Sequence, residues 1–324
     1  YKKGVFADLY PFIDSEENGI DRSDLMENLL KACELNGKLY SIITSYYFQT
    51  LVAKSDFVGT KPGWTIREML DAIAKMPEGM VAFSYDFDRS SLQDMLLSAC
   101  MGSFVNYETG ETSFNSQDFI DLIEFLKSCP EKSIQNAYYE NIDYDNYDAQ
   151  AEQEWYNEYE MRFFKNKALF MNAYVSSFDA FTYTMQQFGG NATLIGYPTT
   201  DENSSGAVVY PNMELGICAA SKNTSSAWQF LKYLLTDEQY AKDNYSFTIS
   251  KKNMQAKLDQ TNQNAEQNGD NEWTDEDWKW YEDNYSEEYV NYLKSSRMKY
   301  TPELGQKVMD IVSTATTVVR YDKK

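Results

Sequence analysis

The chain has 324 residues, enough for a sizeable buried core, and its 43% hydrophobic and 24% charged residues are typical of a folded globular protein. The formal net charge of -21 argues against nucleic-acid binding through a basic patch and against adsorption to anionic membranes. The chain contains no histidine, which excludes Ser-His-Asp and Cys-His catalysis, histidine-ligated zinc and histidine pH switches.

The cysteines and the apolar runs limit the kinds of protein further. Cys33, Cys100, Cys129 and Cys218 lie far apart in apolar contexts and form no CxxC pair. We therefore expect four buried thiols and no structural zinc, while a disulfide stays open. No run approaches the length of a membrane span, and the first residues do not have the pattern of a signal peptide.

In the first half of the chain, short apolar runs predict strands and capping signals predict helices. In chain order these are a strand at 38–44, a strand at 50–54, a helix capped by Thr65 and Glu68 that ends before Pro77, and a helix capped by Ser116 that ends before Pro130. Residues 143–155 are rich in Asp, Asn, Tyr and Glu, and we expect a surface loop there.

The second half continues the alternation of strands and helices. Its predicted elements are strands at 168–174, 193–197 and 214–219, a helix at 226–235, a strand at 247–250, a polar loop at 262–277 and a last helix that opens with Pro302. This alternation predicts an α/β architecture.

A calcium site was considered at Asp143, Asp145 and Asp148. An EF-hand loop requires glycine at its sixth position, where this chain has Asp148. The pattern therefore predicts a solvated acidic loop, and we expect neither a metal ion nor a cofactor.

Several short segments resemble a known family when they are taken in order. They are NGKLYSI at 36–42, LVAKSDF at 51–57, GWTIREM at 63–69, FKNKALFM at 164–171, IGYP at 195–198, GICAASKN at 216–223 and AWQFL at 227–231. In this order they resemble the extracellular sugar-binding proteins of ABC importers. Lys167 stands where that family usually has glycine, and Thr44-Ser45 lacks the family's proline.

The resemblance implies a periplasmic-binding-protein type II-like α/β fold with two lobes joined by crossing hinge segments. Far fewer residues precede the first motif than in the family, so the first lobe is expected to be incomplete. The chain is then similar to the C-terminal part of a larger, propeller-containing protein of gut Firmicutes. The expected division is a remnant of the N-terminal lobe at 1–45 and 213–245, a C-terminal lobe at 46–206 and 252–324, and hinges near 45, 207–212 and 246–251.

The family also implies a function. We expect a cell-surface attached extracellular protein, not an enzyme, that binds a sugar or oligosaccharide by cleft closure and delivers it to the permease subunits of an ABC importer. Two alternatives stay open. One is a glycoside hydrolase with a pair of carboxylates, and the other is a surface interaction module that reuses the fold without transport.

Candidate ligand-binding residues follow from the expected hinges and strand ends. They are Tyr46, Tyr47 and Gln49 past the first crossing, Asp88 and Arg89 before a helix, Tyr174 and Ser176 at the end of the 168–174 strand, and Tyr210 and Asn212 beside the second crossing. Four of them have a structural alternative: hinge packing for Tyr46 and Tyr47, and a helix cap with a solvated arginine for Asp88 and Arg89.

Overall fold

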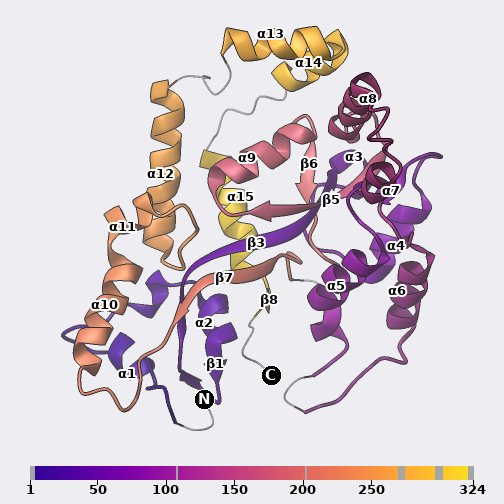
Figure 1. Cartoon of the computed structure of the whole chain (residues 1–324). Coiled ribbons are helices and arrows are strands. Elements are labelled where there is room, and N and C mark those ends of the chain that lie inside the picture. The colour runs from indigo at the N-terminus through magenta and orange to yellow at the C-terminus, as the bar shows by residue number, and fades with distance from the viewer. Residues whose placement is uncertain (1–3, 107–108, 201–202, 269–273, 296–301, 320–324) are drawn as a thin grey trace.

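The computed structural model of the chain describes residues 4–106, 109–200, 203–268, 274–295 and 302–319 (Figure 1). Its helices are α1 Tyr10–Ile13, α2 Glu27–Cys33, α3 Ser55–Val58, α4 Ile66–Ala74, α5 Arg89–Cys100, α6 Gln117–Ser128, α7 Ile134–Glu140, α8 Ala149–Glu160, α9 Phe178–Gln187, α10 Thr224–Thr236, α11 Glu238–Asp243, α12 Lys251–Asn268, α13 Asp275–Asn284, α14 Glu287–Ser295 and α15 Pro302–Ser313. Its strands are β1 Glu34–Leu35, β2 Lys38–Leu39, β3 Ile42–Lys54, β4 Val81–Phe83, β5 Ala168–Val175, β6 Ala192–Leu194, β7 Val208–Leu215 and β8 Thr317–Val318. Strands and helices alternate along the chain, which confirms the predicted α/β class.

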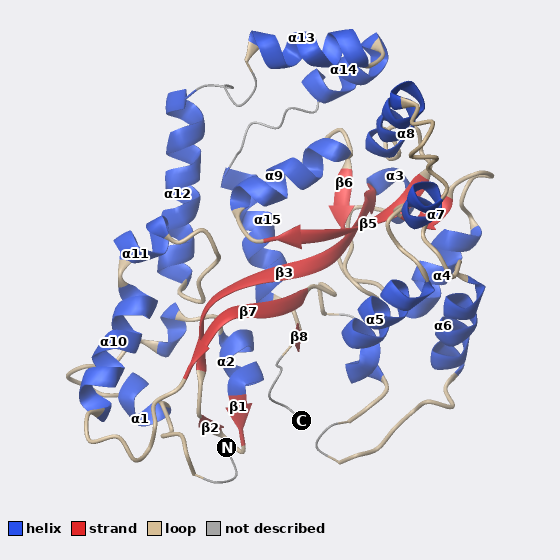
Figure 2. Cartoon of the chain, in the orientation of Figure 1, coloured by secondary structure: helices blue, strands red, loops and turns tan. Residues whose placement is uncertain are grey.

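The long strand β3 forms the centre of a six-stranded sheet with the strand order β4-β5-β3-β7-β8, and β6 also pairs with β3 (Figure 2). β3 runs antiparallel to β5, β6 and β7, whereas β4 is parallel to β5 and β8 is parallel to β7. The sequence predicts two separate strands at 38–44 and 50–54. The structure corrects this, because residues 45–49 continue the pairing with β7 after a register shift between Ile43 and Tyr46.

Pro211 lies inside β7, although proline usually interrupts a strand. Its partner in register is Tyr46, and the backbone N–H and C=O of Tyr46 are bonded to Phe247 on the other side of β3. Pro211 therefore occupies a position at which the ladder with β3 needs no hydrogen bond from its nitrogen. The strand β7 covers Val208–Leu215, so the strand predicted at 214–219 lies earlier in the chain than expected. The strand predicted at 247–250 forms only single bridges.

The buried apolar residues form two clusters, one on each face of the sheet. The first core contains Phe48 and Val175 from the sheet and is covered by α2, α9, α10, α12 and α15. The second core contains Leu51 and Phe170 and is covered by α4, α5 and α6. Because successive strand residues point to opposite faces, neighbouring residues of β3 enter different cores.

Several helices begin where the sequence predicts. Thr65 accepts a hydrogen bond from the backbone nitrogen of Glu68 at 3.2 Å, and the Glu68 carboxylate accepts one from the backbone nitrogen of Thr65 at 2.7 Å. This capping box opens α4. Ser116 caps α6 by accepting a hydrogen bond from the backbone nitrogen of Phe119, and α15 begins at Pro302. These signals are local, so they are visible in the sequence alone.

Both regions predicted to be loops contain helix, and residues 269–273 of the second region lie outside the described residues. The Asp148 carboxylate accepts hydrogen bonds from the backbone nitrogens of Gln150 and Ala151 at 3.0 and 3.1 Å, and this cap opens α8. α12 extends to Asn268 and α13 begins at Asp275. Polar helices lack the apolar stripe on which the sequence prediction depends.

The cysteines differ from the expectation at one position. Cys33, Cys100 and Cys129 are buried as predicted, but Cys218 is exposed, and none of the four forms a disulfide.

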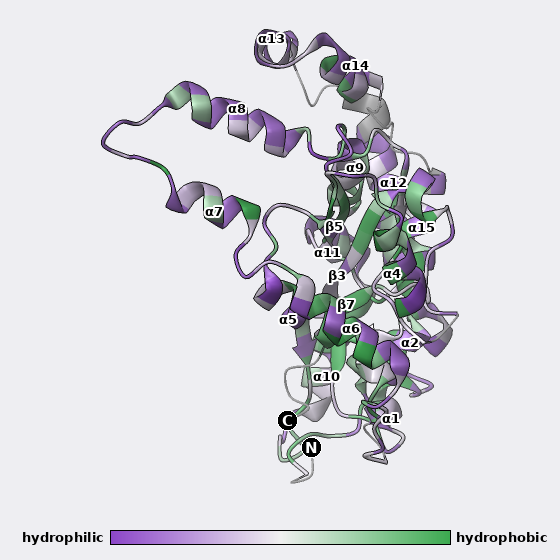
Figure 3. Cartoon of the chain, turned by 90° about the vertical axis from the view of Figure 1, so that its right-hand side faces the viewer, coloured by the Kyte–Doolittle hydropathy of each residue, from purple (hydrophilic) through white to green (hydrophobic). Residues whose placement is uncertain are grey.

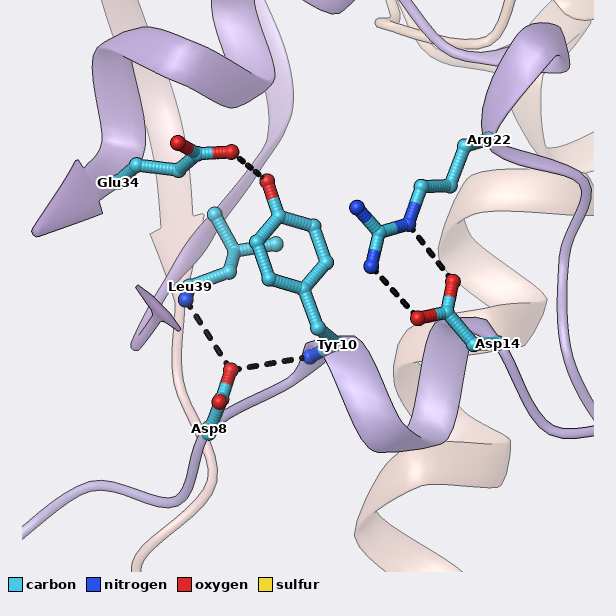
Figure 4. Close-up of polar contacts among 6 residues, drawn as sticks. All are labelled: Asp8, Tyr10, Asp14, Arg22, Glu34 and Leu39. Carbon is cyan, nitrogen blue, oxygen red and sulfur yellow. Dashed lines mark hydrogen bonds and ion pairs between the residues drawn. The ribbon is translucent and has the colours of Figure 1, made fainter. Parts of the chain in front are cut away.

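The first segment of the chain is tied to the body by polar contacts (Figure 4). The Asp8 carboxylate accepts a hydrogen bond from the backbone nitrogen of Leu39 at 3.1 Å. Arg22 donates two hydrogen bonds to Asp14, at 2.7 and 2.6 Å, and its guanidinium lies 3.7 Å from the centre of the Tyr10 ring. These contacts hold the segment around α1 against the strand β2 and the turn that carries Arg22.

The helices α7 and α8 form an arm that projects from the rest of the chain (Figure 3). In the same view α12 and α15 lie on the opposite side of the sheet. Stacked rings stiffen the arm: the Trp155 ring is 4.3 Å from that of Tyr138 and 5.5 Å from that of Tyr159. Arg162, which is buried, lies 4.0 Å from the centre of the Tyr159 ring and donates to Ser84 at 2.7 Å.

Candidate functional site

Strand alternation places three tyrosines on one face of the central sheet. Tyr47 of β3 is opposite Tyr210 of β7, and Tyr174 of β5 is opposite Gln49 of β3. Cross-strand partners share a face, and so do residues two apart on one strand. Tyr47, Tyr174 and Tyr210 therefore lie side by side on three adjacent strands, and we call them the tyrosine platform. Leu51, two residues beyond Gln49, enters the second core, so the platform lies on that face.

Tyr47 is the central ring of the platform. Its centroid lies 4.1 Å from that of Tyr174, with an interplanar angle of 31°, and 5.1 Å from that of Tyr210, with an angle of 3°. Tyr174 is 50% exposed, while the other two rings are half-buried. Aromatic pairs in such arrangements stabilise one another beyond the area they bury. The sheet thus fixes the relative positions of the three rings, which together form a partly exposed aromatic surface.

Amide side chains border the platform on the same three strands. Gln49 and Asn172 are half-buried, and Asn212 is exposed. The Tyr197 hydroxyl donates a hydrogen bond to the Asn172 carbonyl oxygen at 2.5 Å, and Asn212 donates to the Ser246 hydroxyl at 2.5 Å. An amide offers both donors and acceptors, so these groups suit a solute that carries hydroxyls.

The platform and its amides consist of uncharged side chains. Burial raises the pKa of Tyr197 well above its usual value, and Tyr210 and Cys100 add to this effect. Burial, followed by the neighbouring Tyr245, raises the pKa of Tyr174. These hydroxyls therefore stay protonated at neutral pH. In the described part of the chain, no group of three or more Cys, Asp or Glu residues is placed to hold a metal ion.

Two of the predicted site residues are buried. Tyr46 is fully buried on the side of the first core, where its hydroxyl lies 3.4 Å from the Met26 sulfur and its ring centroid 5.8 Å from that of Phe247. Core packing therefore accounts for this residue, because strand alternation turns it away from Tyr47. Ser176 is 6% exposed, directly after β5.

Asp88 and Arg89 do not join the platform either. The Asp88 carboxylate accepts from the backbone nitrogen of Ser91 at 2.8 Å, which makes it the cap of α5. Arg89 donates to the backbone oxygen of Cys129 at 3.1 and 3.0 Å and pairs with Glu131 at 3.2 Å. Asp88 is therefore a helix cap, which was its structural alternative. Arg89 is not only solvated, because its hydrogen bonds join α5 to the end of α6.

Three residues near the platform were not among the predicted site residues: Asn172, Tyr197 and Tyr245. Asn172 had a usable signal, because it lies two residues before Tyr174 on a predicted strand and must share its face. Tyr197 is the third residue of the run IGYP, and nothing in the sequence indicates that its side chain points inward. Tyr245 is 63% exposed and is brought near β5 by the bridge between Phe247 and β3, which is a purely tertiary contact.

A family model described as bacterial extracellular solute-binding protein matches residues 1–281. The chain belongs to this family. The predicted resemblance is therefore confirmed, and the family is one of extracellular binding proteins. None of the described helices of this solute-binding protein combines the length and the apolar character that crossing a membrane requires. No curated protein matches the chain.

Two solved structures are similar to this chain at low sequence identity. A Streptococcus pneumoniae solute-binding protein in complex with the blood group A-trisaccharide is 17% identical, with 98% of this chain and 69% of that chain covered and a TM-score of 0.42. The sugar-binding protein MalE from Xanthomonas citri is 15% identical, with 95% and 79% covered and a TM-score of 0.47. At this level of similarity, neither structure bears on the ligand of this chain.

Proposed function

We propose that this solute-binding protein binds a carbohydrate against the tyrosine platform. The observation that carries the proposal is the stack of Tyr47, Tyr174 and Tyr210 on three adjacent strands, with an exposed ring at its edge. The negative face of an aromatic ring attracts the C–H groups on the flat side of a sugar ring. Gln49, Asn172 and Asn212 would then bind the hydroxyls and orient the sugar.

We also propose that the ligand is held by closure of two lobes about a hinge. The proposed lobes are 1–45 with 213–245, and 46–206 with 252–324. Three proposed hinge segments meet in the sheet, since Tyr46 pairs with Pro211 on one side and with Phe247 on the other. A β-bulge precedes Tyr46 on β3. Crossing segments that lie side by side support a common bending axis, because small backbone changes there rotate one lobe against the other.

Delivery is the last part of the proposal. Attached to the outer cell surface, the protein would pass its carbohydrate to the permease subunits of an ABC importer. Family membership supports this role. An importer that recognises the closed form would discriminate loaded from empty binding protein, because only the ligand makes closure favourable.

Calorimetric titration with a panel of neutral oligosaccharides tests the platform. For a sugar that binds, Tyr174→Ala should weaken the affinity by about tenfold, because one exposed stacking face is lost. Tyr174→Phe should retain most of the affinity, since the ring remains. Tyr233→Ala is a matched control, because Tyr233 is a similarly exposed tyrosine on the helix α10.

Two results would contradict the proposal. One is that no sugar of the panel binds at millimolar concentration. The other is that a sugar binds and Tyr174→Ala and Tyr233→Ala change its affinity equally.

A further inference from the structure

A pocket with a volume of about 640 Å³ opens between the helices α9 and α15 and the strand β6. Its size is in the range in which proteins bind small molecules. The apolar part of its wall consists of residues of the first core, namely Phe181, Met185, Leu194 and Ile311. We call this cavity the α9–α15 pocket. The tyrosine platform lies on the other face of the sheet, beside the second core, and shares no residue with it.

Contacts within the protein hold the walls of the α9–α15 pocket in place. The helices α9 and α15 pack against each other, and α3 packs against β6 (Figure 1). The backbone nitrogen of Ser55 donates to the backbone oxygen of Asn191 at 3.2 Å, and that of Ser205 donates to the backbone oxygen of Thr314 at 3.3 Å. The pocket is therefore formed by the fold itself, so a ligand need not order its walls.

Hydroxyl groups line the pocket, but three of them donate their protons within the protein. Thr193 donates to the backbone oxygen of Gly59 at 2.6 Å, so the hydrogen bond of 2.9 Å between the hydroxyls of Ser55 and Thr193 uses the proton of Ser55. Ser205 donates to the backbone oxygen of Ile311 at 2.7 Å. A hydroxyl has only one proton to donate. A ligand that needs hydrogen-bond donors must find them on other groups of the pocket.

The charged groups of the pocket supply those donors. Lys61, from the turn after α3, and Lys307, from α15, line the pocket and are exposed. Neither lysine forms an ion pair with a described residue. Asp310 also lines the pocket, and its carboxylate accepts a hydrogen bond from Gln306 at 2.8 Å. The lining thus has more basic than acidic groups, although the whole chain has 29 basic and 50 acidic residues.

We propose that the α9–α15 pocket binds an organic anion of single charge with an apolar body, such as an aromatic monocarboxylate. The apolar body contacts Phe181, Met185 and the other apolar wall residues. The carboxylate accepts hydrogen bonds from the two ammonium groups. Two positive charges and one negative charge match a monoanion, whereas a doubly charged phosphate is repelled by Asp310. A cation is disfavoured by both lysines.

Calorimetric titration with 4-phenylbutyrate at low ionic strength, about 20 mM, tests the proposal. We expect a dissociation constant on the order of 1 mM for a ligand of this size. The neutral amide, 4-phenylbutyramide, has nearly the same shape and should bind at least about fivefold more weakly, because its amide group lacks the charge that the ammonium groups recognise. Raising the ionic strength to about 200 mM should weaken only the binding of the carboxylate.

Three variants locate the site. Lys307→Met removes one ammonium group and should weaken 4-phenylbutyrate binding by about threefold or more. Lys75→Met is the matched control at an exposed lysine after α4, outside the lining, and it should leave the affinity unchanged. Asp310→Asn removes the repelling charge and should strengthen the binding by about threefold. None of the three should change the affinity for the amide, and circular dichroism on heating confirms that each variant is folded.

Several outcomes would overturn the proposal. They are equal affinity for the carboxylate and the amide, equal effects of Lys307→Met and Lys75→Met, and no saturable binding up to about 20 mM 4-phenylbutyrate. Tyr174→Ala separates this site from the tyrosine platform. The variant should bind 4-phenylbutyrate as the wild type does, and a loss of affinity would place the anion on the platform instead.

Discussion

Tyr46 and Tyr47 are adjacent residues of one type, and the structure gives them opposite roles. Tyr46 is fully buried against Phe247, whereas Tyr47 is the centre of the exposed tyrosine platform. Successive side chains of a strand point to opposite faces, so only one of the pair can face solvent. The sequence alone placed both in the ligand site, because it did not show that residues 42–54 form one continuous strand.

Lys257 is a buried charge that links α12 to the end of α11. It is 7% exposed, and its ammonium donates hydrogen bonds to the backbone oxygens of Ala241, at 2.7 Å, and Asn244. Burial lowers the pKa of Lys257 to about 8, while Asp179 and Asp243 act in the opposite direction. The unfolded chain binds this proton up to about pH 10.5, so it holds more protons than the folded state between the two values. On this group alone, stability rises as the pH passes upward through 8.

Urea unfolding at about pH 7.5 and about pH 9.5 measures this contribution. The free energy of unfolding should rise more with pH in the wild-type protein than in Lys257→Met, which cannot titrate at this position. Lys252→Met, at an exposed lysine of the same helix α12, should behave like the wild type. Identical pH dependence in wild type and Lys257→Met would show that the buried ammonium titrates normally.

At the scale of single elements, α5 shows how a candidate binding residue can be a helix cap. Asp88 bonds to the backbone nitrogen of Ser91 and begins the helix. We expect Asp88→Ala to lower the free energy of unfolding by about 1 kcal/mol, because an unsatisfied backbone donor is left at the first turn. Asp94→Ala, at an exposed position inside α5, should change it by less than about 0.5 kcal/mol.

Denaturation in urea measures both variants, and the same proteins should be titrated with any carbohydrate that binds the wild type. Unchanged affinity in Asp88→Ala would agree with a purely structural role. A selective loss of affinity, with stability intact, would instead return Asp88 to the ligand site.

The arm shows the limit of element prediction. Residues 143–155 carry no apolar stripe, and the sequence therefore predicted a loop, but α8 begins at the Asp148 cap within them. A polar helix gives no periodic signal, and its stability comes from contacts at its base. In one such contact the Arg162 guanidinium lies over the ring of Tyr159, a residue of α8. No pattern in the sequence indicates this contact, because the sequence did not predict the helix.

For the whole molecule, the net charge of -21 has a predictable consequence. Self-repulsion destabilises a compact acidic chain, and salt screens it. The described ion pairs lie at or near the surface, so screening them costs little. We expect the thermal midpoint to rise by a few degrees between about 10 and about 150 mM sodium chloride.

Potassium chloride should give the same rise at equal ionic strength, because screening does not depend on the cation. A midpoint that falls with salt would mean that the surface ion pairs outweigh the repulsion. Differential scanning calorimetry of the wild-type protein makes this measurement.

The sequence by itself determined the family, the α/β class, the strand at 168–174 and the capped starts of α4 and α6. Each depends on residues close together in the chain, where a capping hydrogen bond or strand alternation acts locally. Only the tertiary structure decided that Tyr47, Tyr174 and Tyr210 stack, and that Trp155 of α8 stacks on Tyr138 of α7. Those groupings follow from the register between strands and the packing of helices, which bring together residues that no local pattern connects.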